Sequence, residues 1–143
     1  MKATGIVRRI DDLGRVVVPK EIRRTLRIKE SDPLEIFTDR DGKIILKKYS
    51  PIGELGDFAK EYAQSLAQVS GYTVCIADHD QIIAASGKRA KEYAGRLIDE
   101  ELETAILNRK TVKLAKKEAV RLTQNDAGGY QSQVISVITS LGD

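Results

Sequence analysis

Short β-branched runs between turn residues dominate the first 50 positions, and this pattern predicts small strands. Gly5–Ile10 and Arg15–Val18 are two strand candidates, joined by a turn over Asp11–Gly14 whose glycine is free to adopt a positive φ. Pro19 suits the first position of a helix, where a missing N–H is tolerated, and the pattern continues that helix over Lys20–Arg27. We therefore expect a strand, a tight turn, a second strand and a short helix.

The next two apolar runs predict a β-hairpin. Leu34–Thr38 and Ile44–Tyr49 lie on either side of Asp41-Gly42, a pair typical of tight hairpin turns. Four short strands and a two-turn helix bury too little surface for an independent core. We therefore expect two chains to share one core as an intertwined dimer.

A break at Ser50–Gly53 divides the chain into a domain over residues 1–50 and a second over residues 51–143. Glu54–Ser70 follows as an amphipathic helix, with Gly71 suited to end it. Its large apolar side chains share one face: Leu55, Phe58, Tyr62, Leu66 and Val69. We expect this stripe to pack on the sheet of the second domain, or on a partner helix, and to couple the two domains.

The rest of the chain predicts a mixed arrangement of helices and strands. Two helices are expected at Ala90–Ile98 and at Glu100–Arg109, the second capped by Asp99. The strand candidates are Tyr72–Ala77, Gln81–Ser86, Val112–Leu114, Ala119–Thr123 and Gln131–Ser140. Helix, hairpin, helices and then antiparallel strands make an α+β order.

The charge is spread unevenly over the 143 residues. Residues 1–50 hold 13 Lys and Arg against 8 Asp and Glu, whereas residues 51–143 hold 11 against 13. A basic half joined to a mildly acidic half suggests different partners for the two domains. A single cysteine excludes an intramolecular disulfide, and no apolar run is long enough to cross a membrane, so we expect a soluble cytoplasmic protein without a membrane partner.

Basic side chains are the strongest candidates for a binding site. On a helical wheel, Arg23, Arg24 and Arg27 gather around Lys20, while Arg8 and Arg15 flank the predicted turn. A charge run is often only a solvated surface, but here four arginines cluster on a small apolar scaffold. Guanidinium groups stay charged and bind phosphate or guanine edges with two hydrogen bonds, so double-stranded DNA is the expected partner.

The segments "TGIVRRIDDLGRVVVPKEIRRTLRI" and "DPLEIF" resemble the AbrB-like swapped-hairpin transcription factors, and "SPIGELGDFAKEYA" extends the likeness toward members that carry a GAF domain. In this family two chains exchange hairpins to form a β-barrel dimer that presents arginines to DNA. The resemblance matches the DNA-contacting arginines to Arg8, Arg15, Arg23 and Arg24, with Arg9 a basic neighbour. It implies a nucleoid-associated dimer or tetramer that activates or represses genes late in endospore formation.

The second domain resembles a GAF module, which implies an antiparallel sheet that pairs with other copies or binds a small molecule of unknown identity. The family pattern continues past Gly142-Asp143, so we expect either a truncated sequence or an incomplete domain. Cys75 reads as a core thiol and Asp78-His79-Asp80 as a turn, so no metal, cofactor or enzymatic activity is expected. The alternative function is an antitoxin-like interaction protein, although such proteins usually carry a disordered tail instead of a folded second domain.

Overall fold

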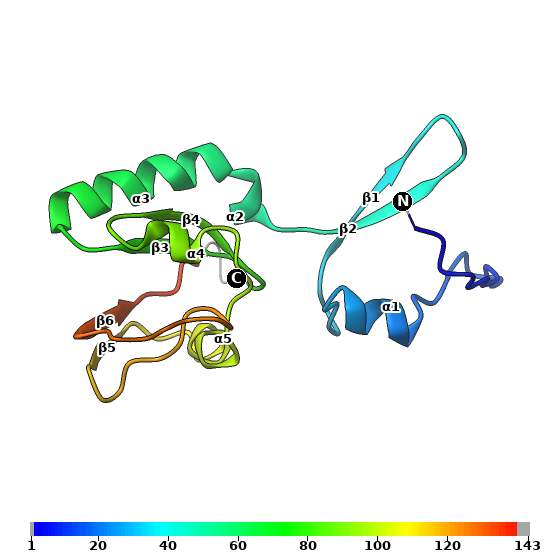
Figure 1. Ribbon diagram of the computed structural model, residues 1–143. Coiled ribbons are helices and arrows are strands. Elements are labelled where there is room, and N and C mark those ends of the chain that lie inside the picture. Colours follow the sequence, from blue (N-terminus) through cyan, green and yellow to red (C-terminus); the bar gives the residue numbers. More distant parts are fainter. Residues whose placement is uncertain (1, 140–143) are drawn as a thin grey trace. The chain divides into compact units, whose positions relative to one another are not determined.

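The computed structural model describes residues 2–139, and the chain divides into two units, Met1–Tyr49 and Ser50–Asp143 (Figure 1). Within residues 2–139, no helix combines the length and the apolar character that a membrane span requires.

The first unit contains one helix and one hairpin. Helix α1 spans Lys20–Thr25, and strands β1 (Leu34–Thr38) and β2 (Ile44–Lys48) pair antiparallel. Leu34 lies opposite Lys48 and Thr38 lies opposite Ile44, while the Asp39 N–H donates to the Lys43 carbonyl at 3.1 Å to close the turn. The predicted hairpin is therefore present, and its second strand ends one residue earlier than predicted, at Lys48.

The strands predicted at Gly5–Ile10 and Arg15–Val18 are absent from this chain. The Asp11 N–H donates to the Arg15 carbonyl at 3.0 Å, and the Gly14 N–H donates to the Asp11 carbonyl at 3.1 Å, so the turn itself forms. The segments that flank the turn do not continue into a ladder. Two short strands without a third strand or a covering helix are only marginally stable, which explains the difference.

Helix α1 is shorter than its sequence pattern predicts. Pro19 has an extended conformation (φ −58°, ψ 146°) and caps the helix instead of forming its first residue. At the other end the helix stops at Thr25, because Leu26 has ψ near 2° and Arg27 adopts a left-handed φ of 57°. Arg27 thus leaves the helix face on which the wheel placed it.

None of the residues described in the first unit is buried. Twelve of its large apolar residues are exposed, from 38% for Leu46 to 84% for Val7: Val7, Ile10, Leu13, Val16, Val17, Leu26, Ile36, Phe37, Ile44, Ile45, Leu46 and Tyr49. A soluble unit rarely leaves so many neighbouring apolar side chains in water, so this surface is one that another surface can cover.

The second unit begins with two helices where the sequence predicts one. Helix α2 (Pro51–Glu54) forms because the Ser50 hydroxyl accepts a hydrogen bond from the Gly53 N–H at 3.0 Å. Leu55, with φ −90° and ψ 22°, separates it from helix α3 (Gly56–Ser70). Gly71 ends α3 in the left-handed conformation (φ 75°), as the sequence predicts.

Helix α3 packs on a hairpin of β3 (Val74–Ala77) and β4 (Ile82–Ser86) (Figure 1). The contact is made by small residues, since Ala59 and Ala63 are buried against Ala84. The expectation that the large apolar stripe faces this sheet is wrong: Phe58 and Tyr62 remain 61% and 64% exposed. Alanines allow a closer approach of helix to sheet than aromatic residues, so the small-residue face is the one that docks.

The remaining elements are α4 (Ala90–Tyr93), α5 (Glu100–Leu107), β5 (Val112–Ala115) and β6 (Ser132–Ile135). The predicted cap of α5 is confirmed, because an Asp99 carboxylate oxygen accepts from the Glu101 N–H at 3.0 Å. The helix predicted over residues 90–98 is too long. It stops at Tyr93, since the next residue is extended (ψ 127°) and Gly95 has φ 73°.

The strands of the described residues form three separate two-stranded sheets: β1–β2, β3–β4 and β5–β6. The strand predicted at Ala119–Thr123 is reduced to one isolated bridge between Thr123 and Ile98. A continuous GAF-like sheet therefore stays a prediction. The strand predicted at Gln131–Ser140 is too long, because β6 ends at Ile135 and residues 136–139 do not form a strand. Its last residue, Ser140, and the expected truncation at Gly142-Asp143 lie outside the described residues.

Two small clusters form the core of the second unit. One is the alanine contact of α3, and the other joins Ile82, Tyr93, Ile98 and Leu102, with Ile106 and Leu122 partly buried against it. The loops after β4 and before β6 thus share a core with α5.

Candidate nucleic-acid interface

The turn before α1 is fixed by one carboxylate. Asp11 Oδ1 accepts hydrogen bonds from the Leu13 N–H at 3.0 Å and the Arg15 N–H at 2.8 Å, and its Oδ2 accepts from Arg15 Nε at 2.8 Å. The backbone bond from Arg15, and to a smaller extent its side-chain bond, lower the pKa of Asp11 below the ordinary carboxyl value. The Arg15 side chain is nevertheless 69% exposed, so the turn presents a cation in a defined direction.

Two further cations precede the turn. Arg8 and Arg9 are both exposed, and Arg8 Nη1 donates to the Val7 carbonyl at 3.0 Å. Because that bond uses one guanidinium N–H, the others remain available to an incoming acceptor.

Helix α1 carries the second group of candidate residues. Lys20, Arg23 and Arg24 are exposed, whereas Ile22 on the other side is partly buried. Arg23 Nε donates to the Val18 carbonyl at 3.1 Å, which orients this guanidinium against the segment leading into the helix. The structure therefore places the six candidate residues on one turn with its flanks and on one short helix.

Arg27 does not belong to this helical group. It is partly buried, and its carbonyl accepts a hydrogen bond from Lys48 Nζ at 2.9 Å. The side chain of Lys48 also lies 3.7 Å from Asp32. The bond from Lys48 ties the segment that follows α1 to β2.

The arrangement suits contacts with a polyanion. Arginines that are held by one hydrogen bond and otherwise exposed can bind phosphate oxygens with little loss of side-chain freedom. Helix and turn present them at fixed positions, so they can meet phosphates that recur along a duplex.

The second unit contains a polar cluster that the sequence analysis did not predict. Tyr93 Oη and Tyr130 Oη lie 2.7 Å apart, and the Tyr130 hydroxyl donates to Asp126, whose side chain is fully buried. The Arg89 guanidinium lies 5.5 Å and 5.1 Å from the two ring centroids and 3.9 Å from the Asp126 carboxylate. Burial and these hydrogen bonds raise the pKa of Tyr130. An acid four residues before a tyrosine was the only signal in the sequence, and Arg89 is too distant along the chain to be linked to it.

The lone candidates behave as structural residues. Burial, with a smaller effect of Asp126, raises the pKa of the Cys75 thiol to about 11. Next to His79, Asp78 Oδ1 accepts from the Asp80 and Gln81 N–H groups at 2.8 Å, which is the chemistry of a turn. Residues 2–139 hold no group of three His, Cys, Asp or Glu side chains that could bind a metal ion.

Two protein families match the chain. Residues 54–143 match the family described as "Stage V sporulation protein T C-terminal, transcription factor". Residues 7–54 match the family described as "Antidote-toxin recognition MazE, bacterial antitoxin".

Curated relatives and solved structures are similar to parts or all of the sequence. Stage V sporulation protein T of Bacillus subtilis (strain 168) is 56% identical over all 143 residues, which cover 80% of that relative. Transition state regulatory protein AbrB of the same organism is 69% identical over 51 residues, 36% of this chain and 52% of that relative. The solution structure of the N-domain of the transcription factor abrB shares 67% identity over 36% of this chain and 96% of that chain, with a TM-score of 0.33.

The relationship covers both units. The 56% identity runs through the arginine-bearing first unit, and the family match at residues 54–143 covers the second. The chain belongs to the stage V sporulation protein T family of transcription factors.

Proposed function

We propose that this chain is a DNA-binding transcription regulator of late sporulation genes, and that its first unit grips DNA through Arg8, Arg15, Arg23 and Arg24, with Arg9 and Lys20 adding charge. The family and the 69% identity to AbrB over the N-terminal residues support this function. The observation that carries it is the set of exposed cations held at fixed positions on the turn and on α1. The second unit matches a family described as a transcription factor, and AbrB is named a regulatory protein. We therefore propose a protein that is not an enzyme and that acts at the nucleoid in the cytoplasm.

Self-association completes the first unit in this proposal. Its described residues include no buried side chain, and twelve large apolar residues are exposed. A second copy would supply the partners that segments 5–10 and 15–18 lack, in a swapped-hairpin barrel with one shared core. The dimer would then present two copies of each arginine to one duplex.

The second unit is proposed as a GAF-like module for pairing and sensing. Its helix α3 leaves a stripe of large apolar side chains uncovered, which suits a contact between dimers. A dimer of dimers would bury this stripe. The small-molecule ligand of such a module would alter DNA binding through α3.

The antitoxin alternative is not favoured. The MazE match covers residues 7–54 only, while the remaining chain matches a transcription-factor family. An antitoxin would need a segment that wraps its toxin, and here the corresponding length is a folded unit.

The substitution Arg23→Ala tests the proposed DNA-binding surface. It removes two cations from a dimer, and each phosphate contact contributes about −0.9 to the slope of log K against log salt, so the slope should become less negative by about 1.8. Each chain of the dimer also loses a charge-assisted hydrogen bond to DNA. The dissociation constant should therefore rise at least about tenfold for each bond lost. Fluorescence anisotropy on a duplex selected from random sequence by the wild-type protein, repeated across salt concentrations, measures both quantities.

Arg40→Ala is the matched control, since Arg40 is exposed in the β1–β2 turn and carries the same charge. Light scattering on each variant checks that assembly is unchanged. Wild-type affinity and slope for Arg23→Ala, or an equal loss for Arg40→Ala, would contradict the proposed interface.

A further inference from the structure

An acidic side chain lies within the surface proposed to bind DNA. Asp11 belongs to the turn between Arg8 and Arg15, and its side chain is 38% exposed. A carboxylate repels the phosphates of a duplex, so the positive charge of this surface does not account for its presence. The hydrogen bonds that this carboxylate accepts supply the reason.

The bonds to Asp11 are of two kinds. Its Oδ1 accepts from the Leu13 N–H at 3.0 Å and from the Arg15 N–H at 2.8 Å, and an asparagine side chain would accept such backbone bonds equally well. Its Oδ2 accepts from Arg15 Nε at 2.8 Å, where an asparagine would present an NH₂ group to another donor. Only the bond from the Arg15 side chain therefore requires a carboxylate.

The bond at Nε determines which part of the Arg15 guanidinium is left for a ligand. Within residues 2–139, Asp11 is the only hydrogen-bond partner of the Arg15 side chain, and that side chain is 69% exposed. Four of the five guanidinium N–H groups remain, and all four belong to Nη1 and Nη2. These two nitrogens donate in parallel to two phosphate oxygens, or to O6 and N7 of guanine.

The pair of Asp11 and Arg15 contributes more to orientation than to stability. An ion pair between side chains as exposed as these adds little to the free energy of unfolding. A long side chain that is held before its ligand arrives loses less conformational freedom on binding. The carboxylate therefore prepares Arg15 for a contact with DNA.

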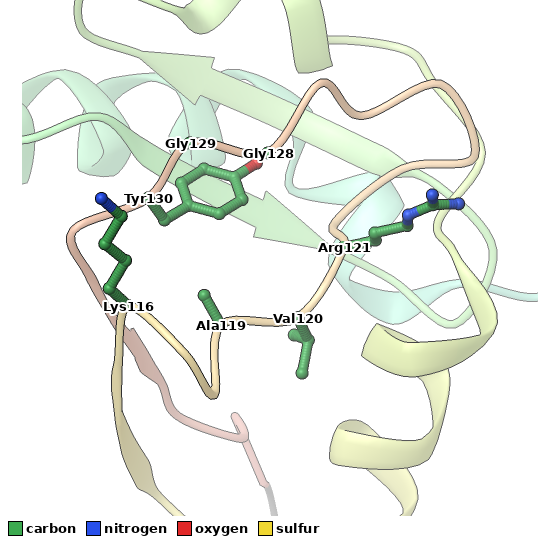
Figure 2. Close-up of a pocket in the computed structure, with 7 residues that line it drawn as sticks. All are labelled: Lys116, Ala119, Val120, Arg121, Gly128, Gly129 and Tyr130. Carbon is green, nitrogen blue, oxygen red and sulfur yellow. The ribbon is translucent and has the colours of Figure 1, made fainter.

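Exposed cations in the second unit are not held in this way. Lys116 and Arg121 both line a small pocket, but Figure 2 shows their side chains on opposite sides of it, with the Arg121 guanidinium directed away. In the part of the chain that the structure describes, no carboxylate bonds to either charged group. Arg15 differs because a neighbouring carboxylate fixes its direction.

We propose that Asp11 is a positioning residue for DNA binding, which holds the Nε side of Arg15 so that Nη1 and Nη2 meet the duplex. This role rests on the DNA-binding function proposed above and adds to it an acid that acts through one arginine. Loss of this carboxylate should weaken DNA binding relative to the loss of a neighbouring carboxylate that holds no arginine.

Asp11→Asn tests this role, and Asp12→Asn is the matched control. Asp12 is exposed in the same turn, and its side chain makes no hydrogen bond or ion pair within residues 2–139. Each variant removes one negative charge per chain from the turn. Ordering one long side chain at an interface lowers affinity at least about twofold, so the dissociation constant of an Asp11→Asn dimer should be at least about fourfold above that of Asp12→Asn. Fluorescence anisotropy on the duplex selected by the wild-type protein measures both constants, and light scattering checks assembly.

The same two variants in an Arg15→Ala background separate orientation of the arginine from a purely structural role in the turn. The backbone bonds from residues 13 and 15 to Asp11 remain possible in that background, whereas the side-chain bond is lost. The fourfold difference between Asp11→Asn and Asp12→Asn should therefore disappear. The same difference in both backgrounds, or no difference in the wild-type background, would overturn the inference.

Arg15→Ala by itself tests the proposed function. If this variant binds DNA more weakly than the wild type but the effect of Asp11→Asn does not depend on Arg15, the positioning role fails and the DNA-binding surface stands. Wild-type affinity for Arg15→Ala would contradict the contact between Arg15 and DNA, and the role of Asp11 would fail with it.

Discussion

The buried carboxylate of Asp126 offers the most specific prediction about stability. Its side chain is fully buried and accepts hydrogen bonds from the Leu122 N–H at 2.8 Å, the Gly128 N–H at 2.8 Å and the Tyr130 hydroxyl. Asp126→Asn keeps the shape of the side chain but replaces one acceptor oxygen by an NH₂ group. If the amide oxygen keeps the bonds from Leu122 and Tyr130, the NH₂ group must face the Gly128 N–H.

The cost of this substitution follows from the bonds that are lost. A buried donor left without an acceptor costs about 1–3 kcal/mol, and here two donors face each other. Arg89 also loses a negative partner, although it keeps the Glu92 carboxylate at 2.8 Å. We expect the free energy of unfolding of the second unit to fall by about 2–4 kcal/mol, or ~10–25 °C in midpoint for a domain of this size.

Native-state hydrogen exchange on the full chain measures this loss in the unit where it occurs. The Leu122 and Gly128 amides should exchange faster by a factor that matches the drop in unfolding free energy. Asp57→Asn is the control, since Asp57 is exposed in the first turn of α3 and its loss should cost less than ~1 kcal/mol. Unchanged exchange and an unchanged urea midpoint for Asp126→Asn would refute the reasoning.

At acid pH the wild-type chain should lose its extra stability over Asp126→Asn. Burial alone would raise the pKa of Asp126, but the hydrogen bonds from Tyr130, Leu122 and Gly128, together with the Arg89 charge, lower it below the ordinary carboxyl value. A carboxyl whose pKa is lower in the folded state stabilises the fold above its unfolded pKa of about 3.9, and this stabilisation is lost as the pH falls below that value. The difference in unfolding free energy between the wild type and Asp126→Asn, measured in urea titrations, should therefore become smaller below about pH 4.

The remaining predictions concern packing, reactivity and assembly. Gly87→Ala should destabilise the second unit by more than ~1 kcal/mol in urea unfolding, because φ is 115° and the added Cβ would lie 2.7 Å from Thr73 Cα; a wild-type midpoint would contradict this. Cys75 should react with iodoacetamide far more slowly than free cysteine at pH 8, since burial raises its pKa to about 11, and a rate equal to that of free cysteine would disprove the burial. Phe58→Asp should lower the assembly state in light scattering if the exposed stripe joins copies, whereas Gln64→Asp on the polar face should not; equal behaviour of the two variants would remove the stripe from the interface.

Local sequence was sufficient for features that depend on neighbouring residues. The β1–β2 hairpin follows from two short apolar runs on either side of Asp41-Gly42, and the end of α3 follows from Gly71. The cap of α5 by Asp99 is equally local. Residue type and spacing also placed the arginines on a turn and a helix, because each position depends on short-range geometry.

Tertiary structure decided which surfaces are covered. The wheel of α3 predicts that its largest apolar side chains face the sheet, yet Ala59 and Ala63 dock because the close approach of helix and β4 favours small residues. The strands expected around Asp11–Gly14 do not form, because no other segment of residues 2–139 pairs with them.

The polar cluster of the second unit depends on the fold in the same way. Arg89 reaches Asp126 and Tyr130 across more than thirty positions of sequence, and Gln133 fixes Val120 from a different element. By itself, the sequence determined the kinds of local element and the basic character of the first unit. Only the packing of distant segments determined which apolar face stays exposed and which polar groups meet around Asp126, because burial and long-range hydrogen bonds are properties of segments brought together in space.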